Sequence, residues 1–199
     1  SIETVNTVKS LIQDKVIEFR RSEFVGPTIS SELLYRGFQA VSFALIAILI
    51  YIWLRFEWQF GFGAVVALTH DVLFTLGLLS ILNVEFSLAT IAAILTIAGY
   101  SINDTVVIFD RVRENLRKYK KMDLINLFNL SVNNTLSRTV MTSVTTLLAL
   151  LSLFIFGGEV IRPFALTMII GVVIGTYSSV FIAVPTLLIF KFRPQDEDD

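Results

Sequence analysis

The sequence has no cysteine, a single histidine and few charged residues. Of its 199 residues, 17% are charged and His70 is the one histidine. The lack of cysteine excludes a disulfide framework, a thiol nucleophile and a Cys-based metal site, and one histidine excludes a multi-His metal centre within the chain. Neither a phosphate-binding glycine motif nor a nucleophile–base triad is present. We therefore predict no enzymatic activity, no cofactor, no metal site and no nucleic-acid partner.

Long apolar segments dominate the sequence. Hydrophobic residues make up 54% of the chain and the mean hydropathy is +0.73, which is not typical of a soluble domain. A helix needs about 20 apolar residues to cross a bilayer, and such continuous runs exclude a β-barrel. The sequence predicts an all-α polytopic membrane protein with five transmembrane helices. They are expected at Gly37–Leu54, Phe60–Leu82, Leu88–Phe109, Thr139–Phe156 and Phe164–Phe190, the last interrupted by Pro185.

Lysine and arginine gather in the loops on one side of these spans. That side holds Arg55, the basic run from Arg111 to Arg138, Lys191 and Arg193, whereas the opposite side holds Arg162, with Arg20, Arg21 and Arg36 ahead of the first span. The positive-inside rule then places the amino-terminal segment outside and the carboxy terminus in the cytoplasm. The expected organisation is an external segment at 1–36, three spans in 37–110, a cytoplasmic segment at 111–137, two spans in 138–190 and a cytoplasmic tail at 191–199.

The two polar segments at 1–36 and 111–137 have local patterns of their own. Apolar residues at helical spacing between Val5 and Phe19 predict a helix, and Glu23–Pro27 reads as a short strand. These would be the remnant of a larger external domain, with a frayed tail as the alternative. Met122–Ser137 predicts an amphipathic helix on the membrane surface, or an ordinary helical loop.

Asp104 lies inside the third apolar segment. A carboxylate in a membrane span is costly and usually faces a bundle interior, a partner or a water-filled path. On a helix it shares one face with small and polar residues, which are Ala93, Thr96, Tyr100, Asn103, Val107 and Arg111, with Ser101 and Thr105 beside that face. This pattern predicts a helix packed inside a bundle and ion or proton handling by Asp104. A carboxylate that only fixes packing is the alternative.

Further polar residues accompany Asp104 in the other spans. Arg138 opens the fourth span and is either a counter-ion for Asp104 or a side chain that reaches the headgroups; the sequence leaves both open. We expect a supporting polar network of His70, Asp71, Tyr100, Asn103, Thr142 and Ser143, although the hydroxyls can also bond their own backbone.

Small residues recur in the fifth span. Gly171, Gly175 and Ser179 are spaced four apart. This spacing is typical of close helix–helix packing in membranes. We expect a helix contact along this stripe.

Several runs together resemble the SecF family of protein-export membrane components. The most specific is Gly99-Tyr-Ser-Ile-Asn-Asp104-Thr-Val-Val-Ile-Phe-Asp110-Arg111-Val-Arg113-Glu114-Asn115. The other runs that fit are Val25-Gly-Pro27, Tyr51–Trp58, His70-Asp71, Leu136–Ser143, Gly157-Gly158 and Gly175–Ser179. The likeness extends from about Val25 onward. In the family a sixth span and the first part of an external α+β domain precede the segment that matches residue 1.

This resemblance implies a function as well as a fold. It implies a member of the resistance-nodulation-division superfamily in the bacterial cytoplasmic (inner) membrane, which uses the proton motive force to promote polypeptide translocation. The implied partners are SecD, the SecYEG channel with accessory membrane proteins, the translocating polypeptide and membrane lipids. The family's proton-relay residues match Asp104 and Arg138. Two alternatives stay open, a proton-driven exporter of small molecules or lipids and a non-transporting membrane scaffold.

The expected topology can be tested by accessibility. Cysteines introduced one at a time at Ser22 and Lys118 should react with a membrane-impermeant thiol reagent from opposite sides, because the chain has no cysteine of its own. In intact cells we expect labelling at Ser22 and none at Lys118 until the membrane is opened. Labelling of Lys118→Cys in intact cells would reverse the orientation.

Overall fold

The structure, a computed structural model, describes residues 7, 10–11, 27–84 and 86–190. The chain divides into two units, residues 1–39 and 40–199, and the second contains the helical bundle treated below. Most of the helix expected near the amino terminus and the strand expected before Pro27 lie outside the described residues, as does the tail expected at 191–199.

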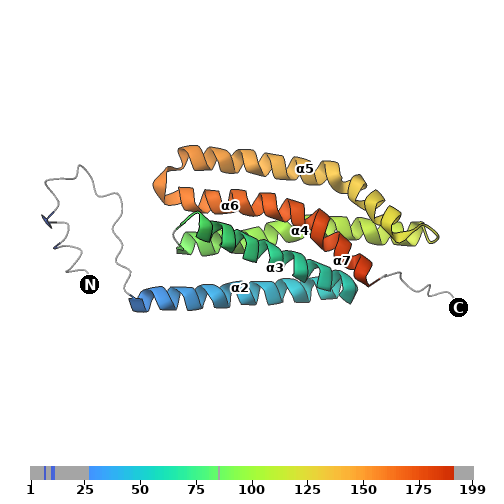
Figure 1. The fold of residues 1–199 in the computed structure, drawn as a ribbon, viewed down its shortest axis with the longest axis horizontal. Coiled ribbons are helices and arrows are strands. Elements are labelled where there is room, and N and C mark those ends of the chain that lie inside the picture. The colour runs from blue at the N-terminus through green and yellow to red at the C-terminus, as the bar shows by residue number, and fades with distance from the viewer. Residues whose placement is uncertain (1–6, 8–9, 12–26, 85, 191–199) are drawn as a thin grey trace. The chain divides into compact units, whose positions relative to one another are not determined.

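Helices make up nearly all of the described part (Figure 1). In chain order they are α2 (Pro27–Arg55), α3 (Trp58–Ile81), α4 (Leu88–Lys118), α5 (Leu124–Phe156), α6 (Gly158–Ser178), a π-helical turn η2 (Ser179–Ala183) and α7 (Val184–Ile189). No strand occurs among the described residues. Five passages are long and apolar enough to cross a membrane, with α6, η2 and α7 together forming the fifth. The predicted all-α fold with five spans is confirmed.

Several of these helices extend beyond the apolar segments expected from the sequence. α2 starts at Pro27 instead of Gly37; a proline is tolerated at the first helical position because its missing N–H has no partner there anyway. α4 continues past Phe109 to Lys118, and Asn115 and Leu116 in this extension are still buried. The segment expected as a cytoplasmic loop at 111–137 is therefore mostly helical, with only residues 119–123 connecting α4 to α5.

The amphipathic helix expected at 122–137 is the first part of α5 and is continuous with the fourth span. The Asp123 carboxylate caps it by accepting hydrogen bonds from the backbone N–H groups of Ile125 (3.1 Å) and Asn126 (3.4 Å). Leu127 and Phe128 are buried against the bundle. The structure differs from a separate surface helix because these apolar side chains find partners on α4 and α7. In Figure 1 the first turns of α5, in yellow, are inclined to the remainder.

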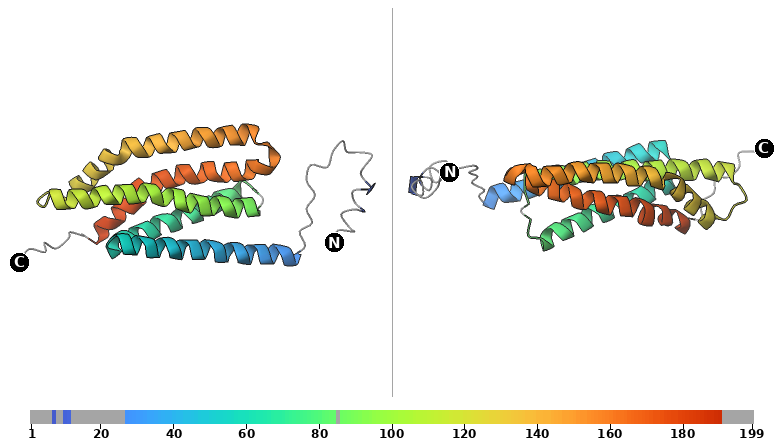
Figure 2. Two further views of the ribbon diagram at one scale, coloured as in Figure 1. Left: turned by 180° about the vertical axis from the view of Figure 1, so that it is seen from behind. Right: turned by 90° about the horizontal axis from the view of Figure 1, so that it is seen from above.

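α3, α4, α5 and α6 lie side by side, with α4 and α6 in the middle (Figures 1 and 2). α6 packs on α4, α5 and α3, and α4 also packs on α5 and α3. α4 and α6 are the most buried of the five spans, and α2 and α5 the least. The polar residues of α4 are thus held in the most enclosed part of the molecule.

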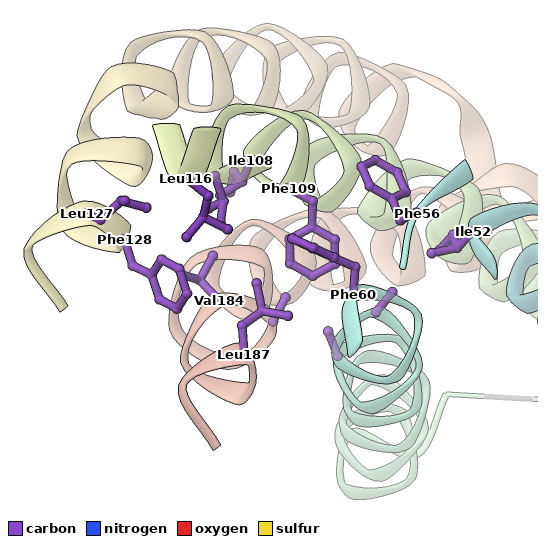
Figure 3. Close-up of a cluster of buried hydrophobic side chains, with 14 residues drawn as sticks. Ile52, Phe56, Phe60, Ile108, Phe109, Leu116, Leu127, Phe128, Val184 and Leu187 are labelled. Carbon is purple, nitrogen blue, oxygen red and sulfur yellow. The ribbon is translucent and has the colours of Figure 1, made fainter. Parts of the chain in front are cut away.

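The largest apolar cluster joins α2, α3, α4, α5, η2 and α7 on the lysine- and arginine-rich side. Its aromatic centre is Phe56, Phe60 and Phe109, whose rings approach to 5.2–6.3 Å (Figure 3). Around them lie Ile52, Ile108, Val112, Leu116, Leu127, Phe128, Val184 and Leu187. Phe109 meets both other rings edge-on, and each such pair adds about 0.5–1.5 kcal/mol beyond the burial of its rings. This cluster fixes the end of the bundle to which α2 contributes.

Two irregularities shape the last span. Gly158 has a φ of +74°, a left-handed conformation that favours glycine, at the turn between α5 and α6. Further along, the π-helical turn η2 comes just before Pro185 in α7. A proline lacks an N–H and crowds the carbonyl four residues earlier, and the wider turn accommodates this. The interruption expected at Pro185 is present as a change of helix type, and the span is not broken.

The small residues of α6 face α4 at close range. A Cβ atom at Gly171 would collide with the side chain of Ile97, and one at Gly175 would lie 2.9 Å from the Cβ of Ser101. Ser179, the third member of the stripe, is fully buried. Gly171 and Gly175 therefore allow α4 and α6 to approach more closely than any larger residue would.

This packing generates a stability prediction. We expect Gly171→Ala to destabilise the purified protein by about 1–3 kcal/mol, because Ile97 has to move to admit the new methyl group. The loss in the Gly171→Ala, Ile97→Ala double variant should be smaller than the sum of the two single losses, because the new methyl group occupies space that Ile97 vacates. Gly77→Ala is the matched control, since nothing lies within 4 Å of a Cβ atom there. Thermal unfolding in detergent measures the difference, and equal midpoints for the two single variants would contradict this packing.

Candidate functional site

Asp104 lies in the interior of the bundle, on the part of α4 that faces its neighbours. Its side chain is only 3% exposed, and Oδ2 has no hydrogen-bond partner among the described residues. Leaving a buried polar atom without a partner costs about 1–3 kcal/mol, and more for a charged group. Such an atom in a native structure calls for an explanation, for example a catalytic role or an unseen water.

Arg138 is on α5 and is exposed. No hydrogen bond or ion pair joins it to Asp104 among the described residues. The structure thus shows no direct contact between the two groups. Both roles considered for Arg138, the counter-ion and the headgroup anchor, remain compatible with this placement.

Three other buried hydroxyls lack hydrogen-bond partners among the described residues: those of Thr75 on α3, Tyr100 on α4 and Thr139 on α5. Tyr100 precedes Asp104 by one turn of α4, and Thr139 follows Arg138 on α5. Like Asp104 Oδ2, these oxygens are buried and have unused hydrogen-bonding capacity. Groups of this kind suit a site that binds and releases protons or water.

The packed face of α4 is rotated from the stripe expected from the sequence. Ala93 and Asp104 are buried as expected, but Thr96 and Asn103 are exposed and Ile94 and Ile108 are buried instead. The cause is that α4 has neighbours on more than one side, so apolar residues flanking the polar stripe also find contacts. Ser101 and Thr105, placed beside the stripe, are both 1% exposed and belong to the centre of the packed face.

His70 and Asp71 lie in α3 and belong to a three-residue hydrogen-bonded chain. Asp71 is fully buried. Its Oδ1 lies 3.1 Å from His70 Nδ1, and its Oδ2 accepts a hydrogen bond of 2.5 Å from Ser101 Oγ on α4. His70 is at the surface of the bundle with 31% of its side chain exposed. The chain of contacts runs from that surface to a residue three positions before Asp104.

The remaining residues of the expected network divide into two groups. Ser143 Oγ lies 2.7 Å from Thr176 Oγ1 and so connects α5 to α6. Thr142 bonds the backbone carbonyls of Arg138 (3.1 Å) and Thr139 (3.0 Å) in its own helix. Asn103 is exposed and makes no side-chain hydrogen bond among the described residues. No hydrogen bond among the described residues joins a member of the expected set to Asp104; His70 with Asp71, and Ser143, take part in two separate contacts between helices.

Several polar contacts were not found by reasoning from the sequence. Ser101 and Thr139 are buried and Thr176 is half-buried, and only the packing of the helices decides this. A buried hydrogen bond of 2.9 Å also joins Asn115 Nδ2 on α4 to Ser131 Oγ on α5. The four-residue spacing from Ser131 to Thr135 and Thr139, all buried on one face of α5, was the available signal.

Ion pairs gather at the arginine-rich ends of α2 and α4. Arg55 pairs with Asp110 at 3.2 Å, and Arg113 Nε lies 3.6 Å from Glu57 Oε1. These groups are partly exposed, and surface pairs of this kind contribute about 0–1 kcal/mol each. They secure the ends of the helices and are separate from the buried polar residues.

A family model decides which proteins this chain is related to. The model described as "Protein export membrane protein SecD/SecF, C-terminal" matches residues 5–193. The chain belongs to the SecD/SecF family. Five membrane-length helices in a member of this family make it a multi-pass membrane protein.

Relatives with assigned names lie within the same SecD/SecF family. The chain is 50% identical over 195 residues to the protein translocase subunit SecF of Rickettsia rickettsii and 52% identical over 192 residues to that of Rickettsia bellii. The first match covers 96% of this chain and the second 95%, and each covers 63% of the relative. The chain therefore spans a little under two thirds of the length of these relatives.

Solved structures of SecDF have the same fold. A crystal structure of SecDF, a translocon-associated membrane protein from Thermus thermophilus, matches with a TM-score of 0.88 and 44% identity over 96% of this chain and 27% of that one. SecDF in a super-membrane-facing form matches with a TM-score of 0.77 and 39% identity, over 96% of this chain and 26% of that one. The helical bundle described here is thus similar to one part of a larger SecDF molecule.

Proposed function

We propose that this chain is the membrane part of a SecF-type subunit that uses the proton motive force to promote polypeptide translocation. It works with SecD and next to the SecYEG channel, and it is a transport component without enzymatic activity of its own. The family match over residues 5–193 and the relatives named SecF support this proposal. The observation behind it is the Asp104 carboxylate, which is buried in the bundle with one oxygen unpartnered among the described residues.

In this proposal Asp104 takes up and releases the proton, and Arg138 responds to its charge. While Asp104 is ionised, the nearby cation of Arg138 is attracted to it; protonation removes this attraction and favours a second arrangement of the helices. One proton crossing a potential of 100 mV supplies about 2.3 kcal/mol, enough to shift a two-state equilibrium about fifty-fold. Asp104 and Arg138 make no direct contact in the structure, as expected for the second arrangement, in which the attraction between them is removed.

The proposed orientation has the amino-terminal side outside and the carboxy terminus in the cytoplasm of a bacterial inner membrane. The basic residues between Arg111 and Arg138 support it, as does the accumulation of ion-paired arginines at the same end of the bundle. In this orientation α4 enters the membrane from the outside and ends among cytoplasmic charges.

Two other functions remain as alternatives. A proton-driven exporter of small molecules or lipids would use the same kind of buried carboxylate, and a non-transporting scaffold would use the packing surface of α6. The relatives named as translocase subunits favour protein export over the first. The unpartnered buried carboxylate argues against a non-transporting scaffold, because it lowers the stability of the protein without adding a contact.

The experiment that tests the proposal is Asp104→Asn in the full-length protein. Asn keeps the size of the side chain but cannot take up the proton. We expect the complex to assemble and the part of export that depends on the proton gradient to be lost, while ATP-driven export persists. The assay measures translocation into inverted membrane vesicles with and without a gradient, and equal stimulation of wild type and variant contradicts the proposal.

Substitutions of Arg138 test whether it acts together with Asp104. If it pairs with Asp104 during the cycle, Arg138→Met should abolish gradient-dependent export as Asp104→Asn does, and the double variant should be no worse than either single variant. Arg138→Lys should be impaired, because the planar guanidinium suits a carboxylate better than an ammonium group does. Full activity of Arg138→Lys would indicate a headgroup anchor, and additive losses in the double variant would show that the two residues act separately.

A further inference from the structure

The contact between α3, α4 and α6 next to Asp104 consists of one continuous series of side chains. His70 meets Asp71, Asp71 accepts from Ser101, and Ser101 sits where Gly175 leaves room on α6. Asp71 and Ser101 are 0% and 1% exposed. The Asp71–Ser101 hydrogen bond joins α3 to α4, and the contact of Ser101 with Gly175 joins α4 to α6, so the series fixes the position of α4 between these two helices.

Gly175 determines where the Ser101 hydroxyl can lie. A Cβ atom at Gly175 would be 2.9 Å from Ser101 Cβ and 3.1 Å from Ser101 Oγ. Both distances are shorter than ordinary contacts, so any larger residue would displace the hydroxyl that donates to Asp71. The absence of a side chain at Gly175 is thus a condition for the Ser101–Asp71 hydrogen bond.

We propose that His70, Asp71 and Ser101 form a strut, a hydrogen-bonded series of side chains, that positions Asp104. Ser101 precedes Asp104 by three residues on the same helix, so the strut sets both the rotation and the height of α4 at the proton site. His70 acts through Asp71, and Gly175 acts through Ser101. The inference rests on the proposed function for its effect on export, but the geometry of the strut can be measured independently.

Substitutions of His70 separate positioning from proton transport. His70→Asn retains an N–H donor near the position of Nδ1 but cannot hold a charge, whereas His70→Leu removes the donor. We expect His70→Asn to keep most gradient-dependent export and His70→Leu to lose most of it. Thr69→Ala, an exposed neighbour on α3, is the matched control. Loss in His70→Asn as complete as in His70→Leu would mean that His70 carries protons, and wild-type export in His70→Leu would mean that no strut exists.

A distance measurement tests the strut without any export assay. Because the chain has no cysteine, spin labels can be attached to cysteines at Gly77 on α3 and Gly99 on α4, where the space around a Cβ atom is open. Electron paramagnetic resonance of the full-length protein should show one narrow distance distribution, and Ser101→Ala should broaden it. Ser80→Ala, an exposed serine of α3, is the matched control and should leave the distribution unchanged.

The two readouts together separate this inference from the proposed function. A broadened distribution in Ser101→Ala, combined with unchanged gradient stimulation in Asp104→Asn, would support the strut and remove the proton role of Asp104. An unchanged distribution in Ser101→Ala overturns the strut whatever the export assay gives. Should Ser101→Ala fail to accumulate, Gly175→Ala offers a second test, because it displaces the same hydroxyl and should broaden the distribution in the same way.

Discussion

The carboxylate of Asp104 is an acidic group enclosed by apolar helices, and the rest of the bundle has to tolerate it. A charge or an unpartnered polar atom in such a place destabilises the protein. The helices around it therefore need stability from other sources. They obtain it from close packing of α4 on α6 and from the aromatic cluster of Phe56, Phe60 and Phe109 at one end of the bundle.

Polar contacts join α4 to the helices on both of its sides. Toward α3 and α6 it is held by the Asp71–Ser101 hydrogen bond and by close contacts at Gly171 and Gly175. Toward α5 it is held by the buried Asn115–Ser131 hydrogen bond, whereas Tyr100, Asp104 and Thr139 each have a buried oxygen without a hydrogen-bond partner among the described residues. In the proposed function, a change in the charge of Asp104 alters the relation of α4 to α5, the helix that contains Arg138.

The five spans, the buried carboxylate and the small-residue stripe could be predicted because each has a local signature: an apolar run, a lone charge in it, and a four-residue spacing. The side chains that these residues contact could not be predicted in this way. Ser101 lies at the centre of the packed face of α4. Because three other helices pack on α4, this face is rotated from the stripe that was expected through Thr96 and Asn103. The amphipathic segment after Met122 merged with α5 since Leu127 and Phe128 found apolar partners in the bundle, and hydrophobic periodicity alone does not distinguish that from a membrane surface.

Infrared difference spectroscopy tests the role of Asp104 most directly. Full-length protein with SecD in liposomes would be measured before and after acidification of the side that corresponds to the cell exterior. If Asp104 is the group that takes up the proton, a carbonyl band of a protonated carboxyl group should appear in wild type and be missing in Asp104→Asn. The same band at full intensity in Asp104→Asn would show that another group accepts the proton, and the central role of this buried carboxylate would be refuted.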